Sequence, residues 1–159
     1  MCVAMLWRPA CVKVGNCMPG SALARTMLAS AQRDLKTLSN MMDSELFDDE
    51  VFGFHTQQAT EKALKAWLIL VSGSRPYTHD LGLVLNDLER AGADVHDYWN
   101  LVDLNSYAVR FRYEAAPVDD DPLDRLALLN DARALVARVA SMIEDPPAAG
   151  SLPDDSLLM

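Results

Sequence analysis

Four polar side chains recur along one face of the segment 49–72, at spacings that suit a helix. At about 100° per residue, one narrow stripe holds His55, Gln58, Lys62 and Lys65. An imidazole, an amide and two ammonium groups in line could hold a phosphate through charge-assisted hydrogen bonds, which makes the stripe a candidate nucleotide or anion site. The same spacing also fits a solvated helix edge with snorkelling lysines. Both interpretations stay open at this point.

A second group of candidate residues follows further along the chain, where Arg110 and Arg112 stand beside Tyr113. Arginine and tyrosine together can grip a phosphate and stack on a base. They could equally form a surface ion-pair cluster that closes a helix, because cations suit the negative end of the helix dipole. If the arginines met Lys62 and Lys65 in an antiparallel bundle, four cations would repel one another, and a bound phosphate would relieve that repulsion.

Other common chemistries find no support in the sequence. The three cysteines, Cys2, Cys11 and Cys17, form no CxxC pair, and the three histidines are scattered, so no metal site is expected and no cofactor is implied. The seven glycines form neither a GxxxxGK nor a GxGxxG motif. No nucleophilic triad can be assembled from the remaining residues.

The elements that must position these side chains are helices, and no strand is expected. Apolar residues recur at three- and four-residue steps with capping signals between them, and the pattern predicts five helices. Their expected bounds are Ser21 as N-cap to residue 42, 48–72 ending at Gly73, Thr78 to Gly92, Asp94 to Tyr113, and Asp121 with Pro122 to residue 145. The predicted class is all-α, an up-and-down antiparallel helical bundle. Residues 1–20 are expected to be a poorly ordered leader, 21–145 the domain, and 146–159 a flexible acidic tail.

The length and the net charge of the chain exclude several classes of function. The 159 residues suit one domain, since domains commonly run about 100 to 200 residues. A net charge of −9 repels duplex DNA and argues against a broad nucleic-acid binder. No apolar run is long enough to cross a bilayer, and the amino terminus does not read as a signal peptide. We therefore expect no membrane contact and a cytoplasmic location.

Three motifs resemble those of prokaryotic HEPN-domain proteins. They are residues 54–68 (FHTQQATEKALKAWL), residues 78–81 (THDL), and Tyr107 followed by 110–113 (RFRY). The resemblance spans roughly residues 21 to 145. It implies a small helical bundle, often a homodimer, of a type commonly encoded beside a minimal nucleotidyltransferase as a toxin–antitoxin pair.

Many HEPN proteins are metal-independent ribonucleases that use an Arg followed four to six residues later by a His. Histidine can move a proton at the ribose hydroxyl and arginine can hold the phosphate. At the matching position, the residues that follow Arg110 and Arg112 contain no histidine. The spacing recurs at Arg90 and His96, but these bracket Gly92 at a predicted turn. Enzymatic activity therefore stays open, and His79 is taken as a capping or surface residue.

These observations predict a HEPN protein that binds a nucleotide or RNA, docks a minimal nucleotidyltransferase, or does both, without efficient RNA cleavage. One alternative is an active HEPN ribonuclease toxin, and another is a helical interaction module with no small ligand. A homodimer is expected, on the premise that the second and fourth helices carry more apolar surface than a five-helix monomer covers.

Overall fold

The computed structural model describes residues 19–108 and 122–144, and these residues form helices and no strand. The described elements are α1 (Pro19–Asn40), α2 (Asp49–Ser72), α3 (Leu81–Arg90), the 3-10 helix η1 (His96–Leu104) and α5 (Arg125–Glu144). The predicted all-α helical bundle is confirmed over this part of the chain. Residues 1–18 of the expected leader and all of the expected tail, 146–159, lie outside the described residues.

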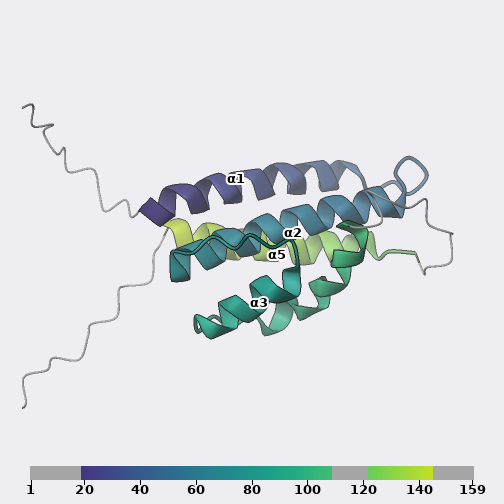
Figure 1. The fold of residues 1–159 in the computed structure, drawn as a ribbon. Coiled ribbons are helices and arrows are strands. Elements are labelled where there is room, and N and C mark those ends of the chain that lie inside the picture. The colour runs from purple at the N-terminus through teal and green to yellow at the C-terminus, as the bar shows by residue number, and fades with distance from the viewer. Residues whose placement is uncertain (1–18, 109–121, 145–159) are drawn as a thin grey trace, which may run out of the picture.

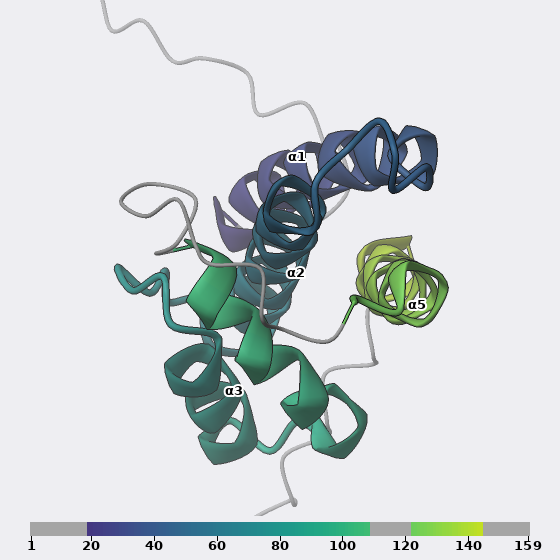
Figure 2. The same cartoon turned by 90° about the vertical axis from the view of Figure 1, so that its right-hand side faces the viewer.

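Three long helices lie side by side, and α3 and η1 pack against one flank of α2 (Figures 1 and 2). Helix α1 runs opposite to α2 and α5. Figure 1 shows this for α2, which follows α1 through a short connection at one end. Two contacts show it for α5: Arg25 near the start of α1 donates to the carbonyl of Ile143, and Arg125 donates to the carbonyl of Met41 just after α1 ends.

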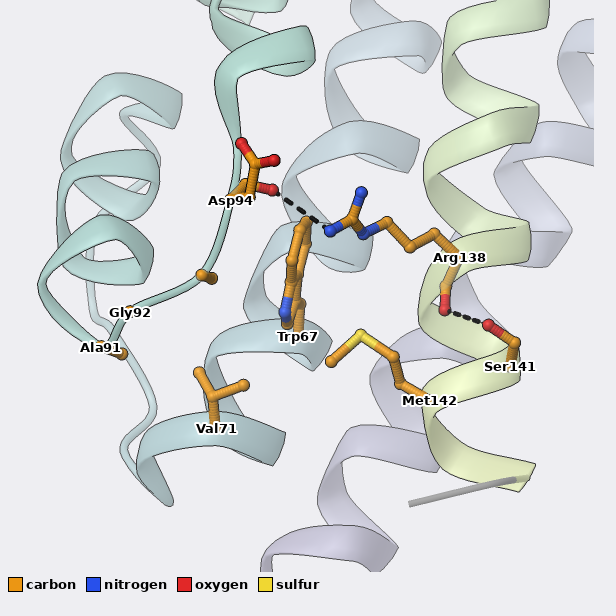
Figure 3. A pocket seen from close by; sticks show the side chains of 9 residues that line it. Trp67, Val71, Ala91, Gly92, Asp94, Arg138, Ser141 and Met142 are labelled. Carbon is orange, nitrogen blue, oxygen red and sulfur yellow. Dashed lines mark hydrogen bonds between the residues drawn. The ribbon is translucent and has the colours of Figure 1, made fainter. Parts of the chain in front are cut away.

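Helix α2 is the centre of the molecule and touches every other described element. Its two apolar flanks are both covered, as the sequence predicted, and Phe52, Leu64 and Trp67 are almost fully buried. Arg138 of α5 lies over the Trp67 ring, with its guanidinium carbon 4.6 Å from the ring centroid (Figure 3). Most apolar side chains of α2 are thus covered within one chain, although Val71 is 39% exposed, and the homodimer stays a prediction.

The predicted bounds of α2 are confirmed, and Gly73 ends it with a φ of 69°. Two other helix starts differ from expectation. Helix α1 already begins at Pro19, so Ser21 lies within it and is not its N-cap. Helix α3 is capped by Asp80, whose carboxylate accepts from the amides of Gly82 and Leu83, and it begins three residues after the expected Thr78.

The fourth predicted helix is mainly a 3-10 helix. Its three buried side chains, Tyr98, Leu101 and Leu104, are spaced exactly three residues apart, which places them on one face at three residues per turn. Residues 105–108 continue as a helical turn, and the rest of the expected helix lies outside the described residues.

The fifth helix begins later than predicted. Pro122 is not helical, and Asp124 accepts from the amide of Ala127 at 3.0 Å in the place expected for Asp121. The amide of Leu123, which precedes the helix, donates to the Asp49 carboxylate of α2 at 3.1 Å.

Arg125 ties three segments of the chain together. Its side chain is 7% exposed and donates to the carbonyls of Met41, Asp43 and Phe47 in the α1–α2 connection. It also pairs with Asp49 at 2.7 Å, and its guanidinium lies over the Phe52 ring. Five donors in a rigid plane suit such a set of acceptors, which a lysine could not match.

We expect Arg125→Met to lower the free energy of unfolding by about 3 kcal/mol, because it strands three carbonyls and a carboxylate. Arg133→Met is the matched control, since Arg133 is exposed on the same helix and should change stability by no more than about 0.5 kcal/mol. Urea unfolding followed by circular dichroism measures both. A similarly small loss in the two variants would contradict a structural role for Arg125.

Candidate functional site

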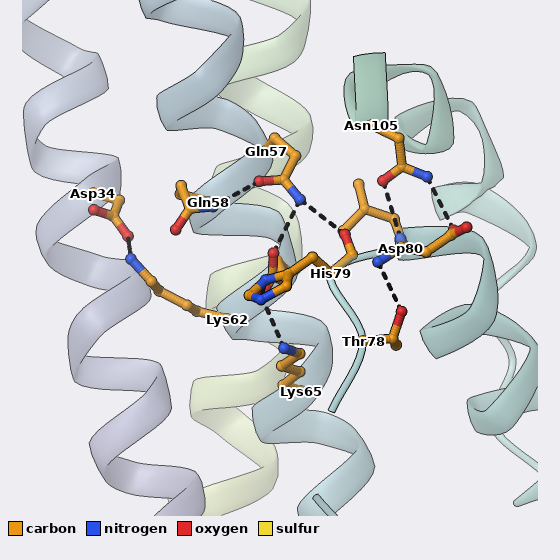
Figure 4. Close-up of polar contacts among 11 residues, drawn as sticks. Asp34, Gln57, Gln58, Lys62, Lys65, Thr78, His79, Asp80 and Asn105 are labelled. Atoms are coloured by element: carbon orange, nitrogen blue, oxygen red, sulfur yellow. Dashed lines mark hydrogen bonds and ion pairs between the residues drawn. The ribbon is translucent and has the colours of Figure 1, made fainter. Parts of the chain in front are cut away.

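A continuous set of polar side chains crosses the face of α2 between α1 and the segment that leads into α3 (Figure 4). We call it the polar strip, and its members are Gln57, Gln58, Glu61, Lys62, Lys65 and His79. Five of them lie on α2. His79 comes from the connection after α2, which runs back along the helix and brings position 79 beside position 61.

Glu61 is the hub of the polar strip, although only 5% of the residue is exposed. Its carboxylate accepts from Lys65 Nζ at 2.8 Å and from Gln57 Nε2 at 3.0 Å. His79 Nδ1 lies 3.0 Å from Glu61 Oε1. Gln57 Nε2 also donates to the backbone carbonyl of His79 at 3.2 Å, which fixes the connection to the helix.

Burial by itself raises the pKa of the Glu61 carboxyl, since a charge is costly away from water. The hydrogen bonds from Lys65 and Gln57 and the positive charges of Lys65 and His79 outweigh burial. The pKa of Glu61 is therefore lowered below its ordinary value of 4.5. Glu61 is an anion at neutral pH and keeps Lys65 neutralised.

The two lysines of the predicted stripe are not free cations. Lys62 Nζ lies 2.6 Å from the Asp34 carboxylate of α1, and Lys65 pairs with Glu61 one turn earlier on its own helix. Lys62 is thus neutralised by an acid of a neighbouring helix, and Lys65 by an acid of its own helix. Because both lysines are paired with acids, the repulsion expected among four converging cations does not arise at Lys62 and Lys65.

The other predicted site residues are placed less closely together. Gln58 donates to Gln57 Oε1 at 2.8 Å and so joins the polar strip. His55 is half-buried near the start of α2, and its ring meets the edge of Phe54 at 5.6 Å between centroids. Its buried Nδ1 has no hydrogen-bond partner within the described part of the chain. The remaining predicted residues, Arg110, Arg112 and Tyr113, lie outside the described residues.

The structure adds members that the sequence reasoning missed. Gln57 and Glu61 precede the predicted Lys65 at four-residue steps, a spacing that pairs side chains along a helix and could have revealed both. His79 had no such signal, because its partner is 18 positions away. Asn105 supports the same region by donating to Asp80 at 3.0 Å and accepting from the amide of Leu81 at 3.1 Å (Figure 4).

The side chain of His79 is exposed to solvent, but a contact with Glu61 orients its ring. Its side chain is 69% exposed, yet its Nδ1 is held against a buried carboxylate. A proton on Nδ1 makes this hydrogen bond and leaves Nε2 facing away from the carboxylate, able to accept a proton or, once protonated, to donate one. An imidazole ordered in this way can bind an anion or move a proton at the surface.

Arg90 and His96, the other pair with the ribonuclease spacing, have no comparable contact that orients the histidine among the described residues. Arg90 ends α3 and pairs with Asp87 at 3.1 Å, whereas His96 opens η1 beyond Gly92, whose φ is 83°. Both residues are exposed. They flank a turn, as the sequence predicted, and neither contacts the polar strip in the described residues.

The fold and the polar strip together define a small helical domain with a histidine-bearing surface on its central helix. The model of the HEPN domain matches residues 24–143, and the chain therefore belongs to the HEPN-domain family. Neither the curated proteins nor the solved structures contain a match for it. Among the described helices, none is long and apolar enough to span a membrane. The described residues hold no group of three or more His, Cys, Asp or Glu that could bind a metal ion.

The lowered pKa of Glu61 predicts a pH dependence of stability. The unfolded chain takes up a proton near pH 4.5 and the folded chain only at lower pH, so the stabilisation is complete above 4.5 and is lost as the pH falls through the folded pKa. We expect wild type to lose more stability than Glu61→Gln between about pH 6 and about pH 3. Glu61→Gln should also cost about 3 kcal/mol at neutral pH, because Lys65 is left buried and unpaired.

Thermal unfolding across this pH range measures the difference. Glu45→Gln is the control, since Glu45 is exposed in the α1–α2 connection and its loss should leave the wild-type profile unchanged. Parallel profiles for wild type and Glu61→Gln would show that Glu61 does not carry the acid sensitivity.

Proposed function

We propose that this HEPN-domain chain binds the phosphate of a nucleotide or of an RNA end at the polar strip, without efficient RNA cleavage. The observation that carries the proposal is the exposed imidazole of His79, ordered by Glu61 and standing on the same face as Gln58 and Lys62. A phosphate there can accept from protonated His79 and from the Lys62 protons that Asp34 does not use.

Arg110, Arg112 and Tyr113 belong to the same proposal as its second half. Support comes from the residues just before them, since Asn105 holds Asp80 beside His79. A Cβ added to Gly53 of α2 would stand 2.4 Å from the Tyr107 ring, so the ring packs directly on the helix backbone there. The described chain thus runs along α2, within a few residues of these arginines.

Docking of a minimal nucleotidyltransferase in a toxin–antitoxin system, and assembly as a homodimer, also remain part of the proposal. Both rest on what is common among HEPN proteins. A short nucleotidyltransferase reading frame beside this gene is the expected finding, and its absence would favour the interaction module.

Calorimetric titration with ATP and with a short single-stranded RNA tests the binding proposal. We expect His79→Ala, Lys62→Ala and Arg112→Ala each to weaken binding about tenfold, the value of one charge-assisted hydrogen bond. Asp34→Asn should act in the opposite direction and strengthen binding, because it frees the Lys62 ammonium. Arg133→Ala, whose side chain contacts Ser39 and not the polar strip, is the matched control.

Two results would overturn the binding proposal. One is the absence of binding at millimolar ligand, and the other is equal binding in wild type and all four variants that alter the site. Either result leaves the helical interaction module as the function that fits the fold.

A second candidate function is a metal-independent ribonuclease, favoured by the contact between His79 and Glu61. A buried carboxylate that orients an exposed imidazole is an arrangement used for general acid–base catalysis. The main proposal predicts that purified protein leaves generic single-stranded RNA essentially uncut over hours. Cleavage that His79→Ala abolishes and His96→Ala leaves intact would establish the ribonuclease, and the reverse pattern would assign it to Arg90 and His96.

A further inference from the structure

A second candidate site lies on a different part of α2, away from the polar strip. A cavity of about 590 Å³ opens between the C-terminal half of α2, the turn after α3 and the helix α5 (Figure 3). We call it the Trp67 pocket, and its lining includes Trp67, Val71, Ala91, Asp94, Arg138 and Met142.

The floor of the Trp67 pocket holds an unused hydrogen-bond donor. Trp67 is 1% exposed, and its Nε1 has no hydrogen-bond partner within the described chain. An indole N–H can only donate, and buried donors are nearly always paired in native proteins. In Figure 3, this nitrogen lies on the side of the ring nearer to Val71 and Met142. This N–H therefore has no acceptor among the described residues, and an acceptor that enters the pocket from this side would pair with it.

A cation packs on the face of the same indole ring. The Arg138 guanidinium carbon is 4.6 Å from the centroid of the Trp67 ring, and the guanidinium donates to the backbone carbonyl of Asp94 at 3.3 Å. No carboxylate of the described residues pairs with it. Figure 3 draws the Asp94 carboxylate on the side of the residue that faces away from Met142. Arg138 thus keeps a positive charge at the mouth of the pocket, in a chain whose net charge is −9.

The rest of the lining is mostly apolar, with Ser141 as a polar member. Val71 of α2, Met142 of α5 and Ala91 of the turn line the cavity, and Val71 is 39% exposed. An apolar group placed there would cover surface that now faces water, which favours binding. The flexible Met142 side chain can adapt its shape to an occupant.

We propose that the Trp67 pocket binds a small carboxylic acid with an apolar tail. One carboxylate oxygen accepts from Trp67 Nε1–H, the Arg138 guanidinium neutralises the charge, and the tail lies against Val71, Ala91 and Met142. A neutral apolar molecule would leave the cation unmatched, and a free phosphate would leave the apolar walls exposed. The site is independent of the proposed function, since it shares no residue with the polar strip.

A nitrogen-labelled sample of the full chain, titrated with sodium hexanoate, tests the site through the indole N–H resonances. The resonance of Trp67 is the one that disappears in Trp67→Phe. We expect a saturable downfield shift of this resonance, as its proton enters a hydrogen bond with the carboxylate, and no comparable shift for Trp99, which already donates to Glu89 at 2.9 Å. Arg138→Gln should weaken the apparent affinity about tenfold, as loss of one charged contact predicts.

Two controls separate the carboxylate from other causes. Arg133→Gln removes an exposed arginine from the same helix and should bind hexanoate as wild type does. Hexanol and hexylammonium should shift the Trp67 resonance far less than hexanoate at equal concentration. The proposal fails if hexanoate causes no saturable shift, if hexanol binds as well, or if Arg138→Gln binds with unchanged affinity.

Discussion

The structure depends on keeping one buried charge satisfied. Glu61 sits on the central helix and is only 5% exposed, and an uncompensated carboxylate there would be very costly. Lys65 and Gln57 supply two partners from the same helix, and His79 supplies the third from the connection to α3. The route of the chain after α2 is therefore set partly by the needs of this carboxylate. That route places His79 on the surface beside Gln58 and Lys62.

Arg125 plays the matching role at the start of α2. It satisfies three carbonyls of the α1–α2 connection and the Asp49 carboxylate, so the start of α2, the end of α1 and the start of α5 meet at one guanidinium. With Glu61 near the middle of α2 and Arg125 at its start, the central helix is fixed by polar contacts in addition to its apolar flanks. Both surfaces that we assign to ligands lie on this helix, which gives them a rigid support.

The two surfaces differ in what they lack. In the polar strip, each lysine already has an acid, so a phosphate gains affinity there from His79 and from spare lysine protons rather than from excess charge. In the Trp67 pocket, a donor and a cation both lack an acidic partner among the described residues. The first surface suits an exchangeable phosphate ligand, and the second suits an occupant that completes its hydrogen bonding.

The sequence by itself determined the helical class, the bounds of α2 and its position between other helices, because these follow from local periodicity and capping chemistry. It also placed Gln58, Lys62 and Lys65 on one stripe, since helix geometry fixes the angles between positions on one helix. Only the tertiary structure decided that Asp34 neutralises Lys62, that His79 reaches Glu61, and that Trp67 and Arg138 meet across α2 and α5. Each of these depends on side chains distant in sequence, whose pairing is set by packing and by the cost of leaving buried polar groups unpaired.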